Sequence, residues 1–333
     1  MRRTLEARVG QVQTRMYRKD VLEDEAFPLA EVSEHLDEPD TVVWVDLCGP
    51  NKDELHELAR ELGLHELAVE DALGPHQRPK LDHYATHRFL SCHAVRLDRE
   101  AAELDDIEID AFVGDRWLIT VREDDRFSMG AVLQRWDRSS ALATHGVSFL
   151  LYGLLDVVVD QYFDVVRAFD EYYDEISESI FDERPLSPAQ QRDWFQMRRA
   201  LVQFNRLVSP TREAVSALMR REHAAVSEDL YPYYQDVYDH ILRISESTDS
   251  LRDLVATIVE TNLGLRDFRQ NQIVKKVSSW AAIFAATAAI TGYYGMNVPY
   301  PGSGETWGVI FSAAVLLVAS FGLYLLFRWR DWL

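Results

Sequence analysis

The stretches Val277-Ser-Ser-Trp-Ala-Ala-Ile-Phe-Ala-Ala-Thr-Ala-Ala-Ile-Thr-Gly-Tyr-Tyr294 and Trp307-Gly-Val-Ile-Phe-Ser-Ala-Ala-Val-Leu-Leu-Val-Ala-Ser-Phe-Gly-Leu-Tyr-Leu-Leu-Phe327 contain no Asp, Glu, Lys or Arg. A helix needs about 20 apolar residues to cross a bilayer, so each stretch can span a membrane once. The first is rich in alanine and hydroxyl residues, and alone it would also fit a buried core helix. Because a second uncharged stretch follows after a short loop, we favour two transmembrane helices.

The charges next to these stretches predict the orientation in the membrane. Lys275 and Lys276 precede the first span, Arg328 and Arg330 follow the second, and the loop between the spans carries no Lys or Arg. By the positive-inside rule both termini are expected in the cytoplasm. The N-terminus has no apolar signal-peptide core, so we expect a multi-pass protein of the cell (inner or plasma) membrane with a large cytosolic portion.

The remaining sequence changes character near residue 145. Short β-branched and aromatic runs at 41–46, 88–95, 107–113 and 116–121, with helical patterns at 51–62 and 67–73, predict an α/β domain. Long helices are expected from Phe149 to Phe181 and from Pro188 to Arg221, the latter strained or broken at Pro210. We therefore divide the chain into 1–145, a cytosolic α/β domain; 146–230, long cytosolic helices; 231–276, a stalk; 277–297 and 307–327, the spans; 298–306, an external loop; and 328–333, a basic cytosolic tail.

Composition limits the partners and ligands of the chain. The formal net charge of -20 argues against nucleic acid as a partner, because the phosphate backbone is itself negatively charged. Cys92 lies near His83, His87 and His93, with His76 a little earlier, but the spacing fits no compact zinc pattern. Cys48 and Cys92 are expected to be reduced thiols in a cytosolic domain.

A very long helix is expected to lead into the first span. No Pro occurs between Pro232 and Pro299, and a helix from Tyr233 to Tyr294 would be roughly 90 Å long at 1.5 Å per residue. Such a helix needs partners, either the preceding helices or other copies of the chain. Two spans are too few to enclose a polar conduit alone, so transport would require an oligomer.

One face of this helix carries small and polar residues at alternating steps of four and three. Its members are Glu260, Gly264, Asp267, Asn271, Val274, Ser278, Ala281, Ala285, Ala288 and Gly292. The pattern suits the lining of an axial pore, with oxygen donors that hard cations accept. It equally suits close helix packing through small residues, and the pattern alone does not separate the two interpretations.

The first span ends in Tyr294-Gly-Met-Asn297, which resembles the signature of the CorA family of magnesium channels. Three further stretches resemble segments of that family, in the family's order: Glu70-Asp-Ala-Leu-Gly-Pro-His-Gln-Arg-Pro-Lys80, Leu150-Leu-Tyr-Gly-Leu-Leu-Asp156 and Asp236-Val-Tyr-Asp-His240. The resemblance covers most of the chain.

This resemblance implies an α+β membrane protein: a homopentamer with a cytosolic α/β funnel domain, whose stalk and first spans line the pore while the second spans face lipid. Gly295, Met296 and Asn297 would form the selectivity filter, with the Gly295 carbonyl and the Asn297 amide accepting hydrogen bonds from hydrated Mg²⁺ and Met296 packing. Val274, Val277 and Ala285 stand at pore-facing positions where many relatives have Met or Leu. The position of a hydrophobic gate is therefore open.

The resemblance also implies regulation by cytosolic Mg²⁺, the ion that is both transported and regulatory. Asp71 and Asp236, with Glu70 as a possible neighbour, correspond to carboxylates that hold Mg²⁺ between subunits and favour a closed state. Lys275, Lys276, Arg328 and Arg330 would form a basic collar, although each singly also fits a topology anchor. Glu305, in the external loop, would attract cations.

Three functions remain to be separated. We expect a Mg²⁺ influx channel that also accepts Co²⁺ and Ni²⁺. We do not expect an enzyme. A zinc transporter of the same family is the nearest alternative, but the expected pore face offers oxygens and no His or Cys. A membrane-tethered sensor is the third, and residues 1–145 show no evident catalytic set. No Walker-type phosphate loop occurs.

Overall fold

The computed structural model describes residues 11–19, 21–74, 77–179, 188–220, 226–296 and 299–333. It divides into two compact units, Met1–Val255 and Ala256–Leu333. The division falls inside helix α7, Tyr231–Tyr294, which is one continuous helix of 64 residues. Each unit is described separately below.

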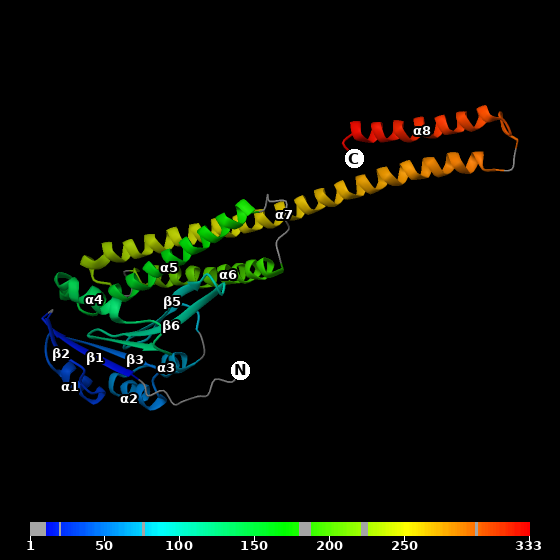
Figure 1. Cartoon of the computed structure of the whole chain (residues 1–333). Coiled ribbons are helices and arrows are strands. Elements are labelled where there is room, and N and C mark those ends of the chain that lie inside the picture. Colours follow the sequence, from blue (N-terminus) through cyan, green and yellow to red (C-terminus); the bar gives the residue numbers. More distant parts are fainter. Residues whose placement is uncertain (1–10, 20, 75–76, 180–187, 221–225, 297–298) are drawn as a thin grey trace. The chain divides into compact units, whose positions relative to one another are not determined.

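A mixed seven-stranded sheet forms the centre of the first unit (Figure 1). The strands are β1 (Gln11–Arg18), β2 (Val21–Glu25), β3 (Thr41–Cys48), β4 (Lys80–His83), β5 (Arg88–Asp98), β6 (Glu103–Val113) and β7 (Trp117–Arg122), in the order β2-β1-β3-β7-β6-β5-β4. Only β3 and β7 are parallel neighbours, and the other described pairs are antiparallel. The four predicted strand runs correspond to β3, β5, β6 and β7.

The strands that sequence patterns missed lie at or near the sheet edges. β2 and β4 are the edge strands, and β1 lies beside β2. Their sequences, QVQTRMYR, VLEDE and KLDH, mix charged and apolar residues, and β2 is mostly exposed. An edge strand is stabilised by backbone hydrogen bonds to one neighbour and little side-chain burial, so its hydrophobic pattern is weak.

Short helices cover one face of the sheet. They are the 3-10 turn η1 (Leu29–Glu31), α1 (Val32–Asp37), α2 (Lys52–Leu62) and α3 (Glu66–Leu73). Asn51 and Glu54 form a capping box at the start of α2, and Gly63 ends α2 in the left-handed conformation that glycine adopts without steric cost. Leu55, Leu58, Ala68 and Val69 lie in one core with buried residues of the central strands.

Longer helices contact the sheet and one another. They are α4 (Gly130–Arg138), the 3-10 segment η2 (Ser140–His145), α5 (Val147–Ser179), α6 (Pro188–Leu218) and the 3-10 turn η4 (Glu228–Leu230). Helix α5 contacts β5, and α6 contacts β4, β5 and β6. Tyr234 of α7 is fully buried and its hydroxyl donates to the Ser148 carbonyl at 2.9 Å, which fixes the start of α7 on α5.

Helix α6 runs through Pro210, so of the two predicted outcomes, a strained or a broken helix, the break is wrong. A proline inside a helix removes one hydrogen bond and costs about 3 kcal/mol or more. Val208 before it and Val215 after it are buried, and the Thr211 hydroxyl donates to the Leu207 carbonyl at 2.8 Å. Packing on both sides of the proline therefore keeps the helix intact.

The second unit contains two apolar helices joined by a short loop. The membrane part of α7 and α8 (Thr306–Trp329) are both long and apolar enough to cross a bilayer. The hydroxyls of Thr287 and Ser320 lie 3.2 Å apart, and Ser279 and Ile283 are buried on the same side of α7. The loop turns tightly: a Cβ on Gly308 would lie 2.2 Å from the Gly302 carbonyl oxygen, so glycine is needed there.

Candidate ion pathway and candidate sensing residues

The predicted pore face of α7 is uncovered in the second unit. Its described residues are exposed in the single chain: Glu260, Gly264, Asp267, Asn271, Val274, Val277, Ser278, Ala281, Ala285, Ala288 and Gly292. At about 100° per residue, this face lies on the opposite side of α7 from Ser279, Ile283 and Thr287, which pack toward α8. Close packing against α8 therefore does not explain the small residues. Pore lining and packing against another copy of the chain both stay predictions.

The outer end of α7 is described only up to Met296. The Gly295 amide donates to the Thr291 carbonyl at 2.9 Å, and a Cβ on Gly295 would lie 3.1 Å from that oxygen. Met296 is exposed. Asn297, the predicted amide of the filter, lies outside the described residues.

Asp71 is paired within its own chain, which the sequence pattern did not indicate. It lies in the last turn of α3, and its Oδ2 is 2.6 Å from Lys80 Nζ on β4. Lys80 also contacts Asp82 Oδ2 at 2.8 Å. Burial by itself would lower the pKa of Lys80, but the hydrogen bonds to Asp71 and Asp82 outweigh it and raise the pKa to about 12. A cation that binds Asp71 must compete with this ammonium group.

Asp236 lies on a different element from Asp71. It is exposed near the start of α7, and its Oδ1 is 3.7 Å from His240 Nε2 one turn later. Glu70 is exposed on α3, next to Asp71. The described residues contain no group of three or more His, Cys, Asp or Glu placed to hold a metal ion. The two predicted sensing carboxylates thus come from different helices, α3 and α7.

The predicted basic collar is gathered at one end of the helix pair. Since α7 and α8 are antiparallel and meet at Thr287 and Ser320, a rise of about 1.5 Å per residue places Lys275 and Lys276 about 16–18 Å from that contact, and Arg328 and Arg330 about 12–15 Å from it. Arg328 also hydrogen bonds the Tyr324 hydroxyl at 3.4 Å.

Glu305 is the N-cap residue of α8, and its side chain makes no capping hydrogen bond. An acidic residue there also stabilises the positive end of the helix dipole, so its position fits a structural role as well as cation attraction.

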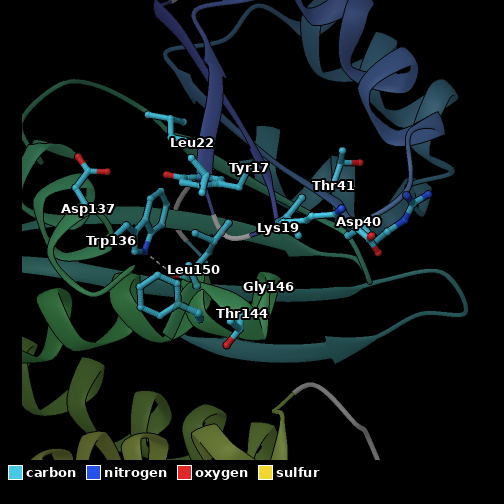
Figure 2. A pocket seen from close by; sticks show the side chains of 15 residues that line it. Tyr17, Lys19, Leu22, Asp40, Thr41, Trp136, Asp137, Thr144, Gly146 and Leu150 are labelled. Carbon is cyan, nitrogen blue, oxygen red and sulfur yellow. Dashed lines mark hydrogen bonds between the residues drawn. The ribbon is translucent and has the colours of Figure 1, made fainter. Parts of the chain in front are cut away.

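A cavity of about 600 Å³ contains none of the predicted site residues (Figure 2). Tyr17 of β1 and Leu22 of β2 lie on one side of the cavity, and Trp136 and Leu150 lie on the other. The Trp136 indole donates a hydrogen bond to the Leu150 carbonyl at 3.1 Å. Charges of both signs, including Lys19 and Asp40, line the rim and favour no ligand class.

Residues 39–329 match the family described as CorA-like Mg2+ transporter protein. The chain belongs to this family. The Cobalt/magnesium transport protein CorA of Thermotoga maritima is 28% identical over 297 residues, which cover 88% of this chain and 84% of that protein.

Two solved structures have the same fold as this CorA-family chain. The complete CorA magnesium transporter of Methanocaldococcus jannaschii superposes with a TM-score of 0.77 at 18% identity, covering 96% of this chain and 98% of the other. The full-length CmaX protein superposes with a TM-score of 0.72 at 19% identity, covering 97% and 98%.

Family membership agrees with the architecture described above. A mixed α/β domain, a long helix leading into the membrane segment and two C-terminal apolar helices form a membrane protein of a metal-ion transporter family. This family consists of transporters rather than enzymes. The resemblance seen in Tyr294-Gly-Met-Asn297 and the other motifs is thereby confirmed.

Proposed function

We propose that the protein is a homopentameric channel that passes Mg²⁺ into the cytosol, with passage of Co²⁺ and Ni²⁺ as minor activities. The family match over residues 39–329 carries this proposal. The exposed small and polar face of α7, opposite the face that packs on α8, supports it. Five copies arranged with these faces inward would cover surfaces that the single chain leaves open.

In the proposed channel, Asn297 selects hydrated Mg²⁺ at the outer mouth. Mg²⁺ releases its water ligands reluctantly, so a ring of amide oxygens and Gly295 carbonyls recognises it through hydrogen bonds from those waters. Glu305 raises the local cation concentration near this ring. A divalent ion gains roughly 4.6 kcal/mol per 100 mV of membrane potential, so influx needs no other energy source.

On the cytosolic side, Mg²⁺ between Asp71 of one subunit and Asp236 of the next closes the channel, and Glu70 assists. Two carboxylates repel each other unless a cation lies between them, so loss of the ion loosens the subunits and favours the open state. The competing Lys80–Asp71 contact supports a site of modest affinity, one that empties when cytosolic Mg²⁺ falls.

Both termini are cytoplasmic in this proposal, and the first unit lies in the cytosol with the basic collar at the inner mouth. Lys275, Lys276, Arg328 and Arg330 then limit cation leak. A hydrophobic gate closes a pore because large apolar side chains exclude water from it, and Val274, Val277 and Ala285 are too small for this role. In the proposed channel, the contact between subunits therefore closes the pore.

Uptake into liposomes tests this function. Purified protein is reconstituted with an internal Mg²⁺ dye. Asn297→Ala, at the end of the first predicted span, is measured in parallel with Ser303→Ala, a control in the external loop that follows. We expect rapid uptake by the protein and by the Ser303 variant, and uptake at the level of empty liposomes for the Asn297 variant. Correctly folded protein that carries Zn²⁺ but not Mg²⁺ would assign it to zinc transport, and protein that carries neither ion would support a tethered sensor.

The oligomeric state is a separate test. The mass of the protein–detergent complex, measured by light scattering, is expected to contain five chains. A monomer would contradict the channel, because two spans per chain do not enclose a pore.

A further inference from the structure

A second cavity in the first unit has a more acidic lining than the first. It measures about 420 Å³ and is bordered by Glu108 and Asp110 of β6, Leu73 and Gly74 at the end of α3, and Glu123 after β7. Glu108 and Asp110 are two residues apart on one strand, so their side chains lie on the same face of the sheet. The proposed transport and sensing mechanism uses neither residue.

Asp110 is buried in an unfavourable way for a carboxylate. Its exposed fraction is 3%, and its Oδ1 has no hydrogen-bond partner within the described part of the chain. Burial, and then the negative charge of Glu108, raise the pKa of Asp110 to about 7. A buried polar oxygen without a partner costs free energy, so a site of this kind calls for a bound positive charge or a proton.

Arg122, a cationic side chain that also lines this cavity, forms its ion pair with Asp46 and not with Asp110. Arg122 donates from Nε to Asp46 Oδ1 at 3.1 Å and from Nη2 to Asp46 Oδ2 at 2.5 Å. Both side chains are buried, and Arg122 Nη1 also donates to the Phe127 carbonyl. The carboxyl end of α3, which borders the cavity, carries the negative end of the helix dipole and adds to the attraction for cations.

We propose that this cavity binds a hydrated divalent cation between Glu108 and Asp110, inside one subunit and separate from the Asp71–Asp236 pair. Mg²⁺ commonly uses one or two carboxylates and keeps several waters, which fits two carboxylates better than a closed set of protein ligands. Six waters at about 30 Å³ each need roughly 180 Å³, which is well within the cavity.

The Glu108–Asp110 site connects the sheet to the helix that carries Asp71. Glu108 Oε1 accepts a hydrogen bond from the backbone amide of Gln77 at 2.8 Å and another from the Ser91 hydroxyl at 3.4 Å. Gln77 lies in the segment between α3 and β4. A cation held there stabilises the folded first unit, because the unfolded chain lacks the site. This proposal stands without the transport function, since it concerns binding within a single subunit.

Binding is measured on the full-length protein in detergent, with Mn²⁺ alone as the probe. The background is Asp236→Ala, which removes one half of the proposed sensing pair and leaves Lys80 with Asp71. Free Mn²⁺ is followed by its six-line electron paramagnetic resonance signal at 0.15 M KCl, a salt concentration that weakens diffuse binding to the acidic surface. Asp110→Asn is compared with Asp115→Asn, an exposed carboxylate in the turn after the same strand.

We expect Asp110→Asn to bind one Mn²⁺ fewer per chain, Glu108→Gln to bind that ion at least tenfold more weakly, and Asp115→Asn to match the background. Equal binding by Asp110→Asn and the background overturns the proposal and leaves a proton as the neutralising group. Thermal unfolding in EDTA provides the folding control. Asp110→Asn is expected to unfold there no earlier than the background, because it removes a buried charge, and to lose the upward shift that Mn²⁺ produces in the background.

Discussion

The two compact units of the chain place their large apolar side chains in opposite environments. In the first unit, Phe89 and Phe112 are fully buried with their rings 5.0 Å apart. In the second, Phe284 is 67% exposed and Val318 is 73% exposed. Large exposed apolar surfaces are not stable in water, so the proposed bilayer and the proposed oligomer would cover those of the second unit, while the first unit covers its own with its sheet and helices.

A plug in the proposed pore face gives the largest expected effect. Ala288→Phe adds a ring to the exposed face of α7, and five rings would fill a narrow axial pore, so Mg²⁺ uptake into liposomes should fall to the level of empty liposomes. Val318→Phe, on the exposed side of α8, is the matched control and should retain uptake. If Ala288→Phe instead breaks the oligomer in light scattering, the face serves packing and not conduction.

Removing one phenylalanine ring from each unit compares how much each ring contributes to the free energy of unfolding. Phe112→Ala leaves a cavity in the sheet core and should lower the free energy of unfolding of the first unit by about 3–5 kcal/mol. Phe284→Ala should change that free energy by less than about 0.5 kcal/mol, because its ring lies outside that core. Urea titrations of the full-length protein in detergent, followed by far-ultraviolet circular dichroism, measure both. Similar losses would show that the units do not have separate cores.

Acid should weaken the first unit through His87. Burial lowers the pKa of His87 to about 4, and its ring lies near Tyr84 and Phe112. An unfolded histidine titrates near 6.5, so between pH 6.5 and 4 the unfolded state binds more protons and stability falls as pH falls, by about 1–3 kcal/mol. His87→Phe should reduce this slope in urea titrations at pH 7, 6 and 5. An unchanged slope would contradict the assignment. Residues 256–333 contain no histidine, so the second unit lacks this sensitivity.

The smallest expected effect concerns the sensing carboxylate. Lys80→Gln removes the ammonium that competes for Asp71, so less internal Mg²⁺ should be needed to inhibit uptake, by roughly two- to fivefold. Arg96→Gln, an exposed cation on the adjacent strand β5, is the control. A need for more internal Mg²⁺ would mean that Lys80 orients Asp71 rather than competing for it.

Elements with a strong periodic hydrophobic pattern were predicted well from the sequence. Elements that depend on contacts with other parts of the fold were not. The uncharged runs gave both apolar helices, and the strand runs gave β3, β5, β6 and β7. The patterns missed β1, β2 and β4, which have mixed polar sequences. They also predicted a strained or broken helix at Pro210, where packing keeps α6 continuous. The membership of the small and polar face of α7 follows from helical spacing alone, and its role as a pore lining stays a prediction.

The candidate sites show the same contrast. Asp71 was singled out by its motif, but no spacing rule indicated that Lys80, nine residues later, reaches it across the α3–β4 connection. In the sequence, Asp110 was only one acidic residue within the predicted strand 107–113, in which apolar and acidic residues alternate. Its burial beside Glu108 depends on α3 and β7, which are distant in sequence from β6.

By itself, the sequence determined two membrane-spanning helices, an acidic α/β domain, the length of α7 and its small-residue face, because these follow from charge, hydropathy and local periodicity. Only the tertiary structure decided the strand order, which side of α7 packs on α8, the Lys80–Asp71 contact and the burial of the unpartnered Asp110 Oδ1. These depend on contacts between residues far apart in the chain, where the partner of a side chain is set by packing and not by the residues next to it.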